Sequence, residues 1–227
     1  MDRWASPRST CEGKPTEPFQ RAQFRSSHKS EIKRAQRSGL VVIEDTRKEH
    51  LGRFGEIYTE NMRRVGAADH CFFDHAYFED LAARLGPALR LFVVLAGEEV
   101  ACAALFIVCD GIIQYHLCGT SAEHLQLAPM KLLVDTVRLW GTERGHKVLH
   151  LGGGVGAQED SLFRFKSGFS DRRHDFFLWR WMLDPLAYDS LCGKKERWNE
   201  ANELRPASAA YFPAYRAPVL PLAHAVA

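Results

Sequence analysis

Apolar residues recur every three or four positions in several stretches of the chain, which predicts amphipathic helices. Residues 89–120 differ, because near-continuous apolar runs there are separated by two short polar turns. These runs predict three antiparallel strands, since Asp110-Gly111 between apolar residues is a typical hairpin turn. The predicted helices are 27–39, 49–64, 74–85, 129–144, 160–167 and one from Pro185, and the other predicted strands are 40–43, 148–151 and 174–183.

The order of these elements predicts the fold class. A helix, a strand and two helices precede the three-strand meander, and a long helix, a strand, a short helix and a strand follow it. This order favours an α/β (α+β mixed) fold, a central mixed, mainly antiparallel sheet flanked by helices. Residues 1–26 are irregular and polar and are predicted to be disordered. The domain is expected over 27–200, with a carboxy-terminal extension over 201–227.

The composition is typical of a soluble globular protein, with 46% hydrophobic and 26% charged residues among 227. No apolar run approaches the ~20 residues that span a bilayer, and the first residues lack the apolar core of a signal peptide. We therefore expect no integral membrane segment and a cytoplasmic location. The six cysteines are scattered without a Cys-x-x-Cys pair, so neither a disulfide framework nor a metal site is predicted.

The net charge of +2 is unevenly distributed, because residues 1–43 hold nine Lys and Arg against four Asp and Glu. Within this basic end, Lys33, Arg34 and Arg37 lie on one predicted helix. They could follow a nucleic-acid backbone, in which case binding would weaken with salt. Solvation of an ordinary helix surface is the alternative interpretation of these charges.

The candidate site lies in the stretch LHLGGGVGAQEDSLFRFKSGF, residues 149–169. Gly152, Gly153 and Gly154 follow a predicted strand and precede a predicted short helix. Glycine permits positive φ and lets backbone approach another backbone or a ligand closely. A helix that starts there also presents unpaired N–H groups. The pattern indicates a substrate-binding turn, and the alternative is a tight turn with no ligand.

The order of elements resembles that of GNAT-type acyltransferases, and four stretches narrow the resemblance. They are similar to the carboxy-terminal GNAT domain of the FemABX group, whose members transfer an amino acid from aminoacyl-tRNA to an amine on a peptidoglycan precursor. The resemblance implies these two partners and no separate cofactor. The stretches are HKSEIKRAQRSGL (28–40), QYHLCGTSAEHLQLAPMKLL (114–133), LHLGGGVGAQEDSLFRFKSGFS (149–170) and YFPAYRAP (211–218).

The resemblance assigns Lys166 to stabilising the tetrahedral intermediate and the terminal nucleotide of the tRNA. Phe165 beside it could stack on a base. Tyr115 lies on a central strand and is a candidate substrate-binding residue. Arg63 and Arg64 end a helix and could hold the phosphates of the acceptor. No general base can be named, since Glu159 and Asp160 are in the position of helix caps.

Two features depart from the family. Its members carry a whole GNAT domain in front of this one, so we expect a short form with impaired activity or a protein partner that replaces that domain. Acetyl-CoA enzymes place a glycine-containing pyrophosphate loop before the long helix, and the corresponding SAEHLQLAPM lacks glycine. The expected function is therefore aminoacyl transfer to an amine acceptor. The alternatives are acetyl-CoA-dependent N-acetylation of a small amine and a non-catalytic module acting in a complex.

Overall fold

The structure is a computed structural model that describes residues 10–12, 17–175, 177 and 179–222. The chain forms two compact units, the first ending at residue 176 and the second beginning at Phe177. The boundary therefore lies earlier than the expected end of the domain at residue 200. None of the helices in the described ranges is both long enough and apolar enough to cross a membrane.

Within the described residues, six strands form the sheet of the first unit, in the order β1-β6-β5-β4-β3-β2. The β5–β6 pair is parallel and the other neighbours are antiparallel. This arrangement confirms the predicted mixed, mainly antiparallel sheet. The strands are β1 (Thr10–Glu12), β2 (Val41–Glu44), β3 (Leu89–Ala96), β4 (Glu99–Cys109), β5 (Ile112–Thr120) and β6 (Val148–His150).

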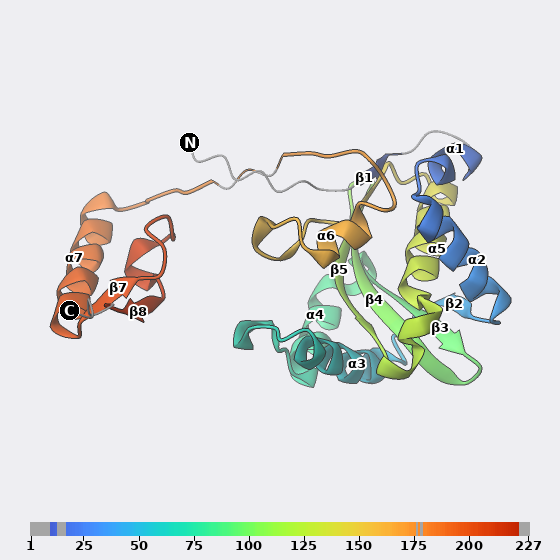
Figure 1. The fold of residues 1–227 in the computed structure, drawn as a ribbon, viewed down its shortest axis with the longest axis horizontal. Helices are drawn as coiled ribbons and strands as arrows, with labels where there is room; N and C mark the ends of the chain where they lie inside the picture. The colour runs from blue at the N-terminus through green and yellow to red at the C-terminus, as the bar shows by residue number, and fades with distance from the viewer. Residues whose placement is uncertain (1–9, 13–16, 176, 178, 223–227) are drawn as a thin grey trace, which may run out of the picture. The chain divides into compact units, whose positions relative to one another are not determined.

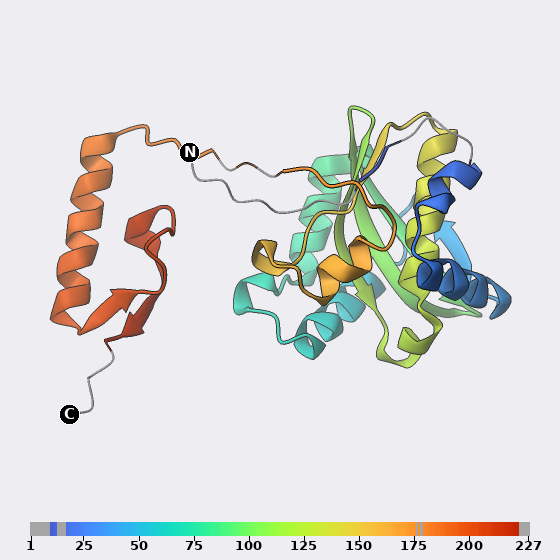
Figure 2. The same cartoon turned by 45° about the horizontal axis from the view of Figure 1, so that its top comes forward.

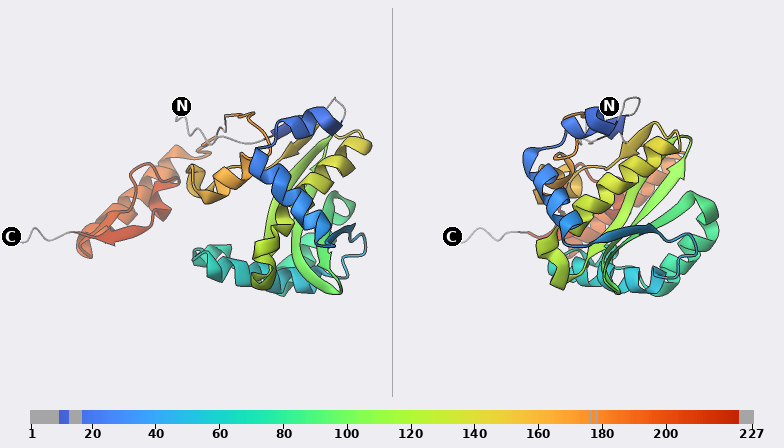
Figure 3. Two further views of the ribbon diagram at one scale, coloured as in Figure 1. Left: turned by 45° about the vertical axis from the view of Figure 1, so that its right-hand side comes forward. Right: turned by 90° about the vertical axis from the view of Figure 1, so that its right-hand side faces the viewer.

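Helices cover both faces of this sheet, as Figures 1 and 3 show. Buried apolar side chains form one cluster on each face. Leu133 and Phe106 belong to the first cluster, and Phe54 and Phe78 to the second, and all four are fully buried. The first face is covered by α2 (Ser26–Arg37) and α5 (Pro129–Glu143), and the second by α3 (Leu51–Arg64) and α4 (His75–Leu85).

Local sequence explains where several of these elements begin and end. Asp110 and Gly111 both have positive φ, 47° and 77°, as a two-residue hairpin turn requires. Pro129 occupies the first turn of α5, where its missing N–H costs nothing. Gly141 allows α5 to lie close to the sheet, because a Cβ there would overlap the Ile113 side chain.

The amino-terminal segment is a correction to the predicted disorder of residues 1–26. Thr10–Glu12 pairs with β6, and Glu17–Ala22 forms helix α1. Gln20 is buried beside α5, where its side chain bonds Arg138 and donates to Thr142 Oγ1 at 3.1 Å. Such buried polar contacts with a distant helix leave no trace in composition or periodicity. Residues 1–9 and 13–16 lie outside the described residues.

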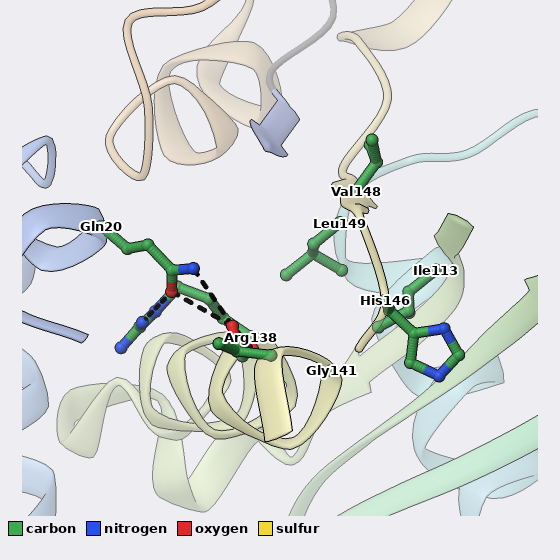
Figure 4. A pocket seen from close by; sticks show the side chains of 8 residues that line it. Gln20, Ile113, Arg138, Gly141, His146, Val148 and Leu149 are labelled. Atoms are coloured by element: carbon green, nitrogen blue, oxygen red, sulfur yellow. Dashed lines mark hydrogen bonds between the residues drawn. The ribbon is translucent and has the colours of Figure 1, made fainter. Parts of the chain in front are cut away.

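A small cavity lies between α1, α5 and β6, and Figure 4 shows the residues around it. Its volume of about 10 Å³ is that of roughly one water molecule. It is therefore a feature of the packing between α1 and α5 and too small for a substrate. Gln20, Arg138, Thr142, His146 and Leu149 are among its lining residues.

The second unit contains helix α7 (Pro185–Ala201) and an antiparallel hairpin of β7 (Leu204–Pro206) and β8 (Val219–Pro221), visible in Figure 2. The predicted helix from Pro185 is confirmed.

The predicted strand over 174–183 is wrong. The described residues of that stretch hold only an isolated bridge at His174, and Trp179 is 94% exposed. In the sheet, β6 has β5 on one side and β1 on the other, so this stretch does not pair with β6. Residues 176 and 178 of the predicted strand lie outside the described residues.

Candidate functional site

The sheet opens where β5 and β6 part. These two strands pair only over Ile112–Gln114 and Val148–His150. β6 then ends, whereas β5 continues to Thr120. The chain leaving β6 forms the glycine turn and helix α6 (Ser161–Lys166). Ligands of open sheets bind beyond the carboxyl ends of parallel strands, so the glycine turn and α6 stand at a position suited to a substrate.

A β-bulge in β5 orients two side chains toward this position. Leu105 of β4 pairs with Leu117, but the next residue, Phe106, pairs with Tyr115, which leaves His116 as the extra residue. Successive side chains of a strand normally point to opposite faces of the sheet, and the bulge interrupts this alternation. Tyr115 and Cys118 therefore both pack in the apolar cluster under α5, and Leu117 packs in the cluster on the other face.

The glycine turn has the special backbone that its sequence predicts. Gly152 and Gly156 have positive φ, 75° and 57°, a conformation that favours glycine. At Gly154 a Cβ would overlap the Gln158 carbonyl oxygen and the Asp160 carboxylate. The loop therefore folds back on itself so tightly that glycine is required there, whether or not a ligand binds.

Asp160 is the N-cap of α6. One carboxylate oxygen accepts from Phe163 N at 2.8 Å and the other from Val155 N at 2.9 Å. Burial raises the pKa of Asp160, but these backbone N–H groups outweigh it and hold the pKa below its usual value. The carboxylate thus joins the glycine turn to α6, and it serves as a cap, as expected for this position.

Lys166 is buried at the end of α6, with 8% of its surface exposed. Its Nζ donates to the Gly153 carbonyl oxygen at 2.8 Å and lies 5.7 Å from the centre of the Tyr115 ring. Burial lowers the pKa of Lys166, and Cys118 and Asp160 oppose that shift. A lysine on an ordinary helix surface would be solvated, so this side chain is held in place by the fold.

Tyr115 completes the surroundings of Lys166. Its side chain is buried, and burial raises the pKa of the hydroxyl well above its usual value, with the Cys118 thiol beside it. Among the described residues the hydroxyl has no hydrogen-bond partner of normal geometry. The structure therefore brings four predicted site residues together, namely Gly152, Gly153, Tyr115 and Lys166, with Gly154 in the same turn.

The other predicted site residues lie elsewhere. Phe165 is half-buried, and its ring packs against Phe169 and His28, so its stacking on a base stays a prediction. Arg63 and Arg64 are exposed in the last turn of α3. No contact in the described ranges joins either arginine to Lys166, and their role toward an acceptor also stays a prediction.

Two residues beside Lys166 were not found from the sequence. Arg25 N donates to the Gly168 carbonyl oxygen at 2.8 Å, and His28 Nε2 donates to the Phe165 carbonyl oxygen at 2.9 Å. Both come from the start of α2. The one available signal was spacing, because His28 shares a helix face with the buried Ile32 and Ala35.

Three residues could offer ligands to a metal ion, although the sequence indicated no metal site. Glu99, Glu123 and His124 have ligand atoms within 4.8 Å of one another. Ser121 Oγ lies 3.3 Å from His124 Nδ1, which leaves Nε2 facing Glu99. Both glutamates are exposed, and the group belongs to β4 and the turn after β5 rather than to the glycine turn.

The chain belongs to the family of acetyltransferase (GNAT) domains, whose model matches residues 22–167. The matched range runs from the end of α1 to just beyond Lys166, so it includes most of the sheet, the glycine turn and α6. No curated protein matches the chain in sequence.

Solved structures with a similar fold include FemX and two others. FemX is 15% identical, with a TM-score of 0.61, over 76% of this chain and 62% of FemX. The carboxy-terminal domain of a putative lysylphosphatidylglycerol synthetase from Agrobacterium fabrum is 12% identical, with a TM-score of 0.56, over 77% of this chain and 59% of that one. L-PGS from Bacillus licheniformis is 14% identical, with a TM-score of 0.52, over the same shares of 77% and 59%. The chain thus spans less than two thirds of each, and at these identities the likeness shows the fold.

Proposed function

We propose that the chain is an acyltransferase domain that moves an aminoacyl group from aminoacyl-tRNA to an amine acceptor, such as a peptidoglycan precursor. The observation that carries this proposal is the buried Lys166 Nζ, fixed on the Gly153 carbonyl oxygen where β5 and β6 part. The GNAT family and the fold shared with FemX, with a putative lysylphosphatidylglycerol synthetase and with L-PGS support it.

The reaction requires stabilisation of negative charge on a carbonyl oxygen. The acceptor amine attacks the ester carbonyl, a C–N bond forms, and the C–O bond to the terminal ribose of the tRNA breaks. The amine loses a proton and the departing ribose oxygen gains one. Each placed donor to the developing oxyanion contributes roughly 10²–10³ in rate. Lys166 suits this role, because its ammonium has three N–H donors and the Gly153 carbonyl takes one.

The turn before α5 favours aminoacyl-tRNA over acetyl-CoA as the donor. Where acetyl-CoA enzymes have a glycine loop, this chain has the 3-10 helix η3 (Ala122–Leu127). Two N–H groups of this turn are used internally, since His124 N donates to the Ser121 carbonyl oxygen and Ala128 N to the Leu125 carbonyl oxygen. Pro129 has no N–H at all. These three positions therefore offer no backbone donor to a pyrophosphate.

The exposed side of α2 offers a surface for a tRNA backbone. Lys33, Arg34 and Arg37 are exposed along this helix, and Arg34 also donates to the Gln126 carbonyl oxygen at 2.9 Å. Binding through such side chains releases counterions and weakens steeply as salt is raised.

A second candidate is N-acetylation of a small amine from acetyl-CoA, because the matching family is described as an acetyltransferase domain. A titration of the full chain with aminoacyl-tRNA and with acetyl-CoA, at low and high salt, separates the two. We expect salt-sensitive tRNA binding, weakened by a Lys33→Ala, Arg37→Ala double variant but little by Ser30→Ala on the same helix.

Tight binding of acetyl-CoA without tRNA binding would overturn the proposal in favour of acetylation. Binding of neither ligand would overturn both and favour a non-catalytic module. Transfer itself is followed as a mass shift on an amine acceptor with isotope-labelled aminoacyl-tRNA, where Lys166→Met should abolish most product.

A further inference from the structure

Helix α6, which carries Lys166, has only six residues. A helix of this length is not stable alone, because each end leaves four backbone groups without intrahelical partners. At its start, Asp160 satisfies two N–H groups of α6 and the glycine turn. The position of Lys166 therefore depends on what satisfies the carbonyl groups at the other end.

The residues that follow α6 supply some donors, since Gly168 N donates to the Phe165 carbonyl oxygen at 3.1 Å and Phe169 N to the Lys166 carbonyl oxygen at 3.2 Å, and the first turn of α2 adds others. Arg25 N donates to the Gly168 carbonyl oxygen at 2.8 Å, and Arg25 Nη1 reaches the Arg164 carbonyl oxygen at 3.4 Å. His28 Nε2 donates to the Phe165 carbonyl oxygen at 2.9 Å. The Phe165 carbonyl belongs to the peptide group that immediately precedes Lys166.

The His28 ring is fixed on all sides. Only 3% of its surface is exposed. It packs edge-on against Phe169, with ring centres 4.7 Å apart, and against Phe165 at 5.9 Å. A Cβ at position 168 would overlap the ring, so glycine is needed there to admit it. The ring cannot shift without moving α6.

We propose that His28 is a positioning residue for Lys166, holding the peptide in front of it and so directing its Nζ toward Gly153. His28 touches neither Lys166 Nζ nor a reacting atom and acts through α6 alone. The catalytic consequence rests on the proposed function, whereas the positioning of Lys166 can be measured without any substrate.

The contacts of His28 require a neutral ring. A carbonyl oxygen only accepts, so Nε2 carries a proton. Nδ1 is buried and has no partner in the described part of the chain. A second proton would create an N–H without an acceptor, and it would place positive charge at the amino end of α2, which the helix dipole disfavours.

The groups around the ring shift the pKa of His28 in both directions. Burial lowers the pKa of His28 most, and Lys131 and Arg25 lower it further, whereas the Phe165 carbonyl oxygen and Glu31 raise it. The net pKa is below the usual 6.5. As pH falls, the unfolded chain therefore takes up the proton first. The stability contributed by the neutral ring falls as pH drops below 6.5 and through the lowered pKa of His28 in the folded protein. Acid should therefore loosen α6.

The test is competitive acetylation of lysines, read by mass spectrometry at Lys166 relative to the exposed Lys33. At about pH 8, where unperturbed histidines are neutral, His28→Leu should raise the labelling of Lys166 about fivefold, as expected for loss of one buried hydrogen bond. His28→Gln retains a donor near the Nε2 position and should restore most of the protection. Gly168→Ala should act like His28→Leu, because it displaces the ring from the other side.

Two controls separate this role from general destabilisation. Ser30→Ala lies on the same helix and His146→Gln removes another histidine, one that stacks on Trp140; both should leave the labelling of Lys166 unchanged. In wild type, amide exchange in residues 161–168 should accelerate below about pH 6.5 beyond its intrinsic change, and in His28→Gln it should not.

Unchanged labelling in a folded His28→Leu protein would overturn the proposal, as would equal labelling in His28→Gln and His28→Leu. If His28→Leu does not fold, Gly168→Ala and the wild-type exchange profile decide. Because labelling needs no substrate, absence of transfer in wild type would refute the proposed function and leave this result standing. In an active enzyme, His28→Leu should lower kcat while tRNA affinity stays constant.

Discussion

Lys166 Nζ and the Gly153 carbonyl oxygen lie 2.8 Å apart, so a lysine at the end of a short helix is fixed by the turn that precedes that helix. The same turn is joined to the helix start through Asp160. The glycine turn and α6 are therefore one structural unit, and its cation points to the place where β5 and β6 part. Changes in the turn and changes in the helix should affect the same side chain.

Replacing Lys166 by Met keeps an unbranched side chain of similar length but removes the cation and its donors. If Lys166 stabilises the oxyanion, single-turnover aminoacyl transfer should fall about 10²–10³-fold. Thermal unfolding should change little, because Met fills the buried space and the Gly153 carbonyl loses one hydrogen bond. The matched control is Lys33→Met on α2, which should retain the rate of transfer. An unchanged rate in Lys166→Met would remove this residue from the chemistry.

Substitution of Gly154 by Ala should destabilise the turn. The added Cβ overlaps the Gln158 carbonyl oxygen, which is backbone and cannot rotate away. We expect a loss of about 1–3 kcal/mol in unfolding free energy and faster acetylation of Lys166. Gly52→Ala on α3 is the control, because its Cβ would meet only the His75 ring at 3.6 Å. A fully stable Gly154→Ala protein would show that the loop is looser than its contacts imply.

The elements that the sequence predicted well are those whose burial is periodic. The helix expected over 49–64 runs over 51–64 and that over 129–144 over 129–143, because each buries its own stripe of apolar residues. The predictions for the described residues of 1–26 and 174–183 were wrong for a different reason. The described part of the first segment is ordered by partners far away in the chain, and β1 takes the place beside β6 that the second could have filled.

The candidate site likewise contains residues that the sequence predicted and residues that it did not. Gly152, Gly153 and Lys166 lie within one continuous stretch, so a local pattern and a family resemblance were enough to single them out. His28 meets Phe165 across 137 positions of sequence, and a contact of that kind has no local signature. The bulge at His116 was equally hidden, because it follows from the register between β4 and β5.

The buried ion pair within α5, which Gln20 of α1 contacts, should be important for stability. Arg138 Nη2 lies 2.7 Å from an Asp135 oxygen, both side chains are buried, and Gln20 bonds the same arginine. Arg138→Met removes one partner and leaves the buried Asp135 carboxylate with the half-buried Arg21, whose Nη2 lies 3.5 Å from the other carboxylate oxygen. We expect a loss of about 3–5 kcal/mol, measured by urea unfolding with far-ultraviolet circular dichroism.

The double variant Arg138→Met, Asp135→Leu should recover much of that loss, since two apolar groups replace both charges. Arg144→Met, at a half-exposed position beside Trp140, serves as the control and should change stability by less than about 1 kcal/mol. Equal losses in Arg138→Met and Arg144→Met would show that the buried pair has no special weight.

The cap of α6 should make this helix sensitive to acid through Asp160. The carboxylate has a lower pKa in the folded protein than in the unfolded chain, because Phe163 N and Val155 N donate to it more strongly than burial disfavours it. The unfolded chain therefore binds the proton first as pH falls. The stability due to the carboxylate is fully present above the unfolded pKa of about 3.9 and is lost as pH falls through the lowered folded pKa.

Amide exchange in residues 155–168, followed from neutral pH into acid, should show this loss in wild type. In Asp160→Asn exchange should be faster at neutral pH and should lack the step below about pH 4, while the separate His28 step that begins below about pH 6.5 remains. Asp171→Asn, which removes an exposed carboxylate of the same unit, should behave as wild type in both windows. A step below about pH 4 that persists in Asp160→Asn would assign the sensitivity there to another group.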